Sequence, residues 1–104
     1  MWFCVSTLSL SEHPNGSEPS VEQVWEEHFF LIAANDTAEA KVKAERLAKS
    51  QQCTYEAANG SKVSWKFKFI SKVFELDGEP ADGTEVFSRF LKGSEVQSMQ
   101  TSFS

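Results

Sequence analysis

Residues 62–76 read KVSWKFKFISKVFEL, and this stretch decides the fold. At its start, apolar side chains alternate with lysines and a serine; the apolar set is Val63, Trp65, Phe67 and Phe69. A period of two places one set on one face of a β-strand and the other set on the opposite face. The pattern therefore predicts a long antiparallel strand with one buried face, and it carries no catalytic signature.

The dipeptide Asn59-Gly60 precedes this strand and predicts a hairpin with a short strand over residues 53–57. Two registers are open. A loop of two or four residues sets Glu56 opposite Val63, whereas a three-residue loop with a left-handed Gly60 sets Tyr55 opposite Val63. A slip of one residue reverses every face. We prefer the three-residue loop because it unites the apolar sides of the two strands.

The rest of the chain predicts an α+β fold in the order ββαβββ. One helix packs on a curved, mainly antiparallel sheet of four to five strands. The helix begins at a capping box, Asp36 to Glu39, and reaches Ser50 or Gln51. Its apolar stripe comprises Ala40, Ala44, Leu47 and Ala48. The other strands are expected over residues 2–11, 24–33 and 84–91. Residues 1–91 form a single domain, and residues 92–104 form a polar, mobile tail.

The strand over residues 24–33 is apolar on both faces, which predicts a central position in the sheet. Phe29 and Leu31 share one face with Trp25, while Phe30 and Ile32 share the other face with Glu26 and His28. We expect the alanine stripe to cover only the Phe29 face. The interaction residues are then His28, Phe30 and Ile32, which would meet a partner or a second copy of the chain.

A polar constellation joins the second and fifth predicted strands. If these strands are neighbours, Arg89 can pair with a glutamate and stack on an aromatic ring. A cross-strand ion pair is the favoured interpretation, and a contact with a ligand or partner is the alternative. We therefore retain Glu26, Glu85 and Arg89 as candidate ligand or interaction residues.

The charge is distributed in blocks. The net charge is −5, but residues 1–40 hold seven acids and no Lys or Arg, residues 41–72 carry +6, and residues 73–104 carry −4. Solvated faces with local ion pairs explain this pattern, and a bipolar surface for a partner is the alternative. Nucleic-acid binding is disfavoured, because the chain is acidic and strand alternation separates the lysines of residues 62–76 from the aromatic side chains.

Signals for chemistry are weak. Two cysteines and two histidines lack close metal-ligand spacing, and phosphate-loop and nucleophile-elbow motifs are not found. No metal, cofactor or catalytic residue is therefore predicted. A thiolate of Cys4 or Cys53 paired with His28 is an alternative that the spacing does not support. Without an export signal or an apolar run of roughly 18 residues, we expect a cytoplasmic protein with two buried, reduced thiols.

Several short strings occur in a recognisable order. They are Met1-Trp2-Phe3, Trp25-Glu26-Glu27, an Ala/Glu/Lys helix, Asn59-Gly60 followed by Val63-x-Trp65-x-Phe67, and the run from Gly83 to Arg89. In this order and spacing the chain resembles, over about residues 1–91, a small bacterial family catalogued as domain of unknown function 4288. The resemblance implies a compact single domain and transfers no activity, cofactor or catalytic residue.

These observations predict a small cytoplasmic protein that is not an enzyme and that acts by binding another protein or a second copy of itself. One alternative is a sensor for a small anion, with a pocket between helix and sheet and Arg89 as the anchor. Nucleic-acid binding and an enzyme of unrecognised type are further alternatives. An interaction protein should expose an open apolar patch, whereas a sensor should enclose a pocket with convergent polar groups.

Overall fold

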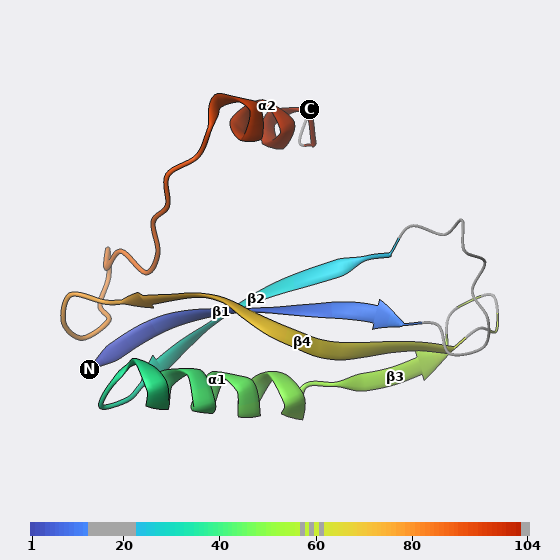
Figure 1. Ribbon diagram of the computed structural model, residues 1–104, viewed down its shortest axis with the longest axis horizontal. Coiled ribbons are helices and arrows are strands. Elements are labelled where there is room, and N and C mark those ends of the chain that lie inside the picture. Colours follow the sequence, from blue (N-terminus) through green and yellow to red (C-terminus); the bar gives the residue numbers. More distant parts are fainter. Residues whose placement is uncertain (13–22, 57, 59, 61, 103–104) are drawn as a thin grey trace.

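The structure, a computed structural model, describes residues 1–12, 23–56, 58, 60 and 62–102. An antiparallel sheet carries helix α1 on one face, and a second helix, α2, stands apart on the other side (Figure 1). The elements in chain order are β1 (Trp2–Glu12), β2 (Trp25–Ala33), α1 (Thr37–Ser50), β3 (Cys53–Glu56), β4 (Lys62–Glu75) and α2 (Gly93–Ser102). The mixed α+β class and the antiparallel sheet are confirmed. Pro14, Asn15-Gly16 and Pro19 predict a loop over residues 12–20, of which residues 13–20 lie outside the described part of the chain.

The four strands are arranged in the order β2-β1-β4-β3. β1 lies inside the sheet because its first half is apolar on both sides: Phe3 and Val5 are buried on one face, and Cys4 is buried on the other. The predicted central position of β2 is wrong, since β2 is an edge strand. Its two apolar faces do not mean that both faces are covered, and one of them remains largely exposed.

β4 crosses the sheet with two irregularities against β1. Its pairing steps from Ile70 to Lys72 and from Phe67 to Phe69, so Ser71 and Lys68 are extra residues. The alternation of apolar residues shifts phase near Ile70-Ser71, a pattern that predicts a bulge there, and the extra residue Ser71 confirms it. The bulge at Lys68 was not predicted, and it turns Phe69 onto the face opposite Phe67. The expectation that the four apolar residues at the start of this strand share one face is therefore wrong for Phe69.

The β3–β4 hairpin has the preferred register. Tyr55 lies opposite Val63, and Cys53 lies opposite Trp65. Gly60 has a φ of 86°, the left-handed conformation that a glycine adopts without steric cost. The three-residue loop with a left-handed glycine is thus the better description of this turn.

Helix α1 begins where its cap was predicted. The Asp36 side chain accepts a hydrogen bond of 2.8 Å from the Glu39 backbone N–H. Ala40, Ala44 and Ala48 are buried, but Leu47 is 40% exposed, so it does not belong to the buried stripe. The small alanine side chains allow α1 to lie close to the sheet. The core beneath them contains Phe3, Val5, Ile32 and Ala34, with Phe30, Ile70 and Val73 packed at its margin.

The C-terminal region differs most from expectation. No strand forms over residues 84–91, and helix α2 occupies residues 93–102 of the predicted tail. Hence the fifth strand, the single helix and the order ββαβββ are wrong. The segment before α2 is held to the sheet through Phe87, whose ring lies 5.7 Å from that of Phe29 and 5.9 Å from that of Phe74. Phe87 thus packs on the sheet, although its segment does not join the backbone hydrogen bonding of the sheet.

Candidate functional site

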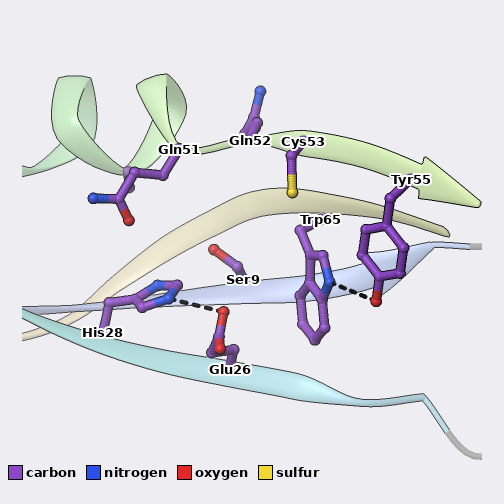
Figure 2. A pocket seen from close by; sticks show the side chains of 9 residues that line it. Ser9, Glu26, His28, Gln51, Gln52, Cys53, Tyr55 and Trp65 are labelled. Atoms are coloured by element: carbon purple, nitrogen blue, oxygen red, sulfur yellow. Dashed lines mark hydrogen bonds and ion pairs between the residues drawn. The ribbon is translucent and has the colours of Figure 1, made fainter.

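A pocket of about 210 Å³ lies where α1 ends and the sheet continues (Figure 2). It forms because the helix stops at Ser50 and because β1 presents a small side chain, Ser9, on this face. Its lining residues are Ser9, Glu26, His28, Ala48, Gln51, Gln52, Cys53, Tyr55 and Trp65. The sequence predicted a pocket between helix and sheet only as the alternative function.

Two predicted site residues meet in this pocket. His28 Nε2 lies 2.8 Å from Glu26 Oε1. A carboxylate oxygen can only accept, so Nε2 carries the hydrogen, and in a neutral imidazole Nδ1 is then an acceptor. His28 Nδ1 is buried without a partner among the described residues, as is the hydroxyl of Thr7, which lies opposite His28 on β1. His28 lines the pocket and Thr7 does not, so this unused hydrogen-bonding capacity lies beneath the pocket, between β1 and β2.

The far wall of the pocket is aromatic. Trp65 Nε1 donates a hydrogen bond of 3.4 Å to the hydroxyl of Tyr55. Glu26 is the only carboxylate in the described lining, and no Lys or Arg contributes to it. A carboxylate in a small pocket disfavours an anion. The predicted anchor for an anion, Arg89, lies elsewhere, so the pocket lacks the chemistry of the anion-sensor alternative.

The structure brings Cys53 and His28 into the same lining, which the spacing of these residues in the sequence did not indicate. No hydrogen bond joins them within the described residues, so the contact that an imidazole needs to activate a thiol is not made. Both cysteines are free. Cys4 is buried, and burial raises the pKa of its thiol. Cys53 is exposed, which corrects the expectation of two buried thiols.

Thiol labelling should separate the two cysteines. In the native protein we expect a disulfide reagent such as dithiobis(nitrobenzoate) to modify Cys53 rapidly and Cys4 only after unfolding. The reason is that the thiolate is the reacting form and that Cys4 is both shielded and less acidic. Cys53→Ser should remove the rapid phase. Rapid modification of both thiols in folded protein would show that the face bearing Cys4 is open.

Two predicted interaction residues, Phe30 and Ile32, lie in or beside the core. Phe30 pairs with Val5, Ile32 pairs with Phe3, and Ile32 is 3% exposed beneath α1. The argument that placed them on an uncovered face is wrong, because α1 covers the face that bears Phe30, Ile32 and His28. The division of β2 into two faces was correct, but the helix lies on the other face from the one we expected.

The predicted constellation around Arg89 does not assemble. Glu85 and Arg89 are exposed on the segment between Phe74 and α2, and neither forms an ion pair with a described residue. The strand that would have brought them beside β2 is absent. Glu27 instead accepts a hydrogen bond of 2.5 Å from the Ser6 hydroxyl.

The face of the sheet opposite α1 carries large apolar side chains that sequence reasoning missed as a site. We call the surface formed by Trp25, Phe29, Leu31, Phe69 and Phe74 the aromatic face. Trp25, Phe29, Leu31 and Phe69 are 46%, 51%, 48% and 49% exposed. The rings of Trp25 and Phe69 lie 6.2 Å apart across β1, and the exposed Glu27 lies between Trp25 and Phe29 along β2. The alternation of β2 separates Phe29 and Leu31 from Phe30 and Ile32, but the sequence predicted Phe29 and Leu31 on the face that the helix covers.

Comparison with known families supplies the remaining observation. The chain matches the family described as Domain of unknown function (DUF4288) over residues 2–88. It belongs to DUF4288. The match includes every strand of the sheet and Phe87, and it leaves Arg89 and α2 outside. No curated protein and no solved structure matches the chain. Neither helix in the described part of the chain is long and apolar enough to cross a membrane.

Proposed function

We propose that this DUF4288 protein is a non-enzymatic protein-interaction module whose binding surface is the aromatic face. The observation that carries the proposal is that Trp25, Phe29, Leu31 and Phe69 lie on one face of the sheet and are each about half exposed. Monomeric proteins rarely leave large apolar side chains grouped in this way unless the patch has a binding role. Tryptophan and other aromatic residues also supply much of the binding energy in protein interfaces.

The contact made by Phe87 supports this proposal. Its ring is held between Phe29 of β2 and Phe74 of β4, although the surrounding segment forms no strand. The aromatic face therefore accepts an apolar side chain from a chain segment that is not part of the sheet. A partner that presents apolar side chains would use the same packing. The two free thiols fit the reducing cytoplasm that we propose as its location.

Single-stranded nucleic acid is the competing ligand for this face. The bulge at Lys68 leaves Lys66 and Lys72 on the same side as Phe69 and Phe74, so the expected separation of lysines from aromatic side chains is incomplete. Acidic groups oppose this alternative. The Glu12 carboxylate lies 2.6 Å from Lys68 Nζ, and this hydrogen bond holds the pKa of Glu12 below its usual range. The net charge of −5 also repels phosphates.

Affinity purification with a matched pair of variants tests the proposal. Leu31→Asp places a charge on the aromatic face, and Val42→Asp places the same charge on α1, where Val42 is 48% exposed. All samples are treated with nuclease. The wild type and Val42→Asp should retain protein partners, whereas Leu31→Asp should lose them. Binding of a purified partner to the three proteins should follow the same order. Identical retention by both variants would contradict the proposal. Tight, salt-sensitive binding of labelled single-stranded DNA or RNA would assign the face to nucleic acid instead.

A further inference from the structure

We infer that the partner for the aromatic face is a second copy of this chain, whose C-terminal arm covers the face while its own aromatic face receives the arm in return. The arm is defined as residues 88–102, which include α2. This inference rests on the proposed function and names the occupant of the same surface. It is carried by the apolar residues of the arm, by the shape of the single chain and by the contact of Phe87.

The arm has apolar side chains with nothing to pack against. Phe90 is fully exposed, and Leu91, Val96 and Met99 are 37%, 40% and 41% exposed. Val96 and Met99 are three residues apart, so they lie on the same side of α2. α2 packs against neither α1 nor any strand in the described part of the chain. The arm therefore carries exposed apolar side chains of its own, as the sheet face does.

The dimensions of the chain also indicate that the arm does not pack against the sheet. The Cα radius of gyration is 16.7 Å, whereas a compact domain of this length has a radius of about 13 Å. Figure 1 shows the reason: between β4 and α2 the chain runs away from the sheet, and α2 stands clear of it. A single copy therefore does not bring its arm and its aromatic face together.

The contact of Phe87 connects the two surfaces. It fills the space between Phe29 and Phe74, but Trp25 and Leu31 remain about half exposed. The next apolar residues along the chain, Phe90 and Leu91, are exposed. The face is thus partly occupied by its own chain and keeps room for apolar side chains supplied from elsewhere.

A reciprocal exchange of arms would bury the aromatic face and the apolar side chains of the arm together. In a two-fold dimer each copy donates one arm and receives one, which is the closed arrangement commonest among oligomers. Glu95 is the only charged residue of α2, so burial of this helix removes little charge from water. Lys66 lies on the receiving face, where it can meet Glu95, whereas Lys72 Nζ already lies 5.2 Å from the centre of the Phe87 ring. Pairing through the free edge of β2 is the competing way to join two copies.

Sedimentation equilibrium at tens to hundreds of micromolar tests the inference on the full chain. The wild type should be a dimer, and the dissociation constant should rise at least about 30-fold in Leu31→Asp and in the double variant Val96→Asp/Met99→Asp. Val42→Asp, the same substitution on an exposed helix position, should remain a dimer. Circular dichroism melts establish that each variant is folded, and Leu31→Ala and Met99→Ala replace any aspartate variant that is not.

Mixing the two defective variants makes the test specific for exchange. The face variant keeps an intact arm and the arm variant keeps an intact face, so a mixed dimer has one complete contact that neither homodimer has. The mixture should therefore associate more tightly than either variant alone. A monomeric wild type, or a dimer lost only in Leu31→Asp, would overturn the inference. If the wild type is a monomer, the proposed function is still tested separately by the purification experiment. If the dimer is lost only in Leu31→Asp, the aromatic face is a binding surface, but the arm is not what binds it.

Discussion

Phe3→Ala should lower the free energy of unfolding by about 3–5 kcal/mol. Phe3 is 1% exposed and belongs to the core cluster beneath α1, so truncation removes buried area and leaves a cavity between the helix and β1. Chemical denaturation followed by circular dichroism measures the loss. The matched control is Val42→Ala, because Val42 is 48% exposed on α1 and its truncation should change stability by less than about 0.5 kcal/mol. Equal losses would mean that Phe3 does not lie in the core.

Ile32→Asp should leave the protein largely unfolded, whereas Leu31→Asp should leave it folded. The two residues are adjacent on β2, but Ile32 is 3% exposed beneath α1 and Leu31 is 48% exposed on the aromatic face. An unpaired charge at the buried position costs about 3–5 kcal/mol, to which the lost apolar packing adds, out of a total stability of about 5–15 kcal/mol.

Thermal melts of the two variants read out which face of β2 is covered. The predicted order is a large drop in Tm for Ile32→Asp and a small change for Leu31→Asp. The reverse order would place α1 over Leu31 and would restore Phe30 and Ile32 as exposed interaction residues.

Local patterns predicted most of the secondary structure. Alternation in residues 62–76 placed β4, and the preference for uniting apolar sides selected the register in which Tyr55 faces Val63. The spacing of Asp36 and Glu39 fixed the start of α1. Each of these features depends on residues near one another in sequence, or on two strands joined by a short turn, so elementary stereochemistry determines it.

Features set by distant contacts could not be predicted. The alternation in β2 divides its side chains into two sets but does not say which set the helix covers. Phe30 was therefore predicted on the uncovered face and Leu31 on the covered face, whereas the structure has the reverse. The bulge at Lys68 arises from pairing with β1, which is more than fifty residues away, and no local signal marked it. The predicted fifth strand over residues 84–91 had a suitable composition, but β2 and β3 occupy the edges of the sheet without it.

The candidate site was predicted in part for the same reason. Glu26 and His28 are two residues apart on one strand, so their contact at 2.8 Å follows from strand geometry. The aromatic face combines residues of β2 and β4 that pair with opposite edges of β1. Its members become neighbours only when the strand order is known, and the Phe87 contact depends on a segment that forms no regular element.

The central claim is that the aromatic face binds the C-terminal arm of a second copy, and isotope-filtered NOE spectroscopy tests it most directly. The sample is an equal mixture of ¹³C-labelled and unlabelled full-length chain, in which filtered NOEs arise only between copies. The account predicts NOEs from the methyl groups of Val96 and Met99 to the side chains of Trp25 and Leu31. Intermolecular NOEs confined to the outer edge of β2, or none at several hundred micromolar, would contradict it.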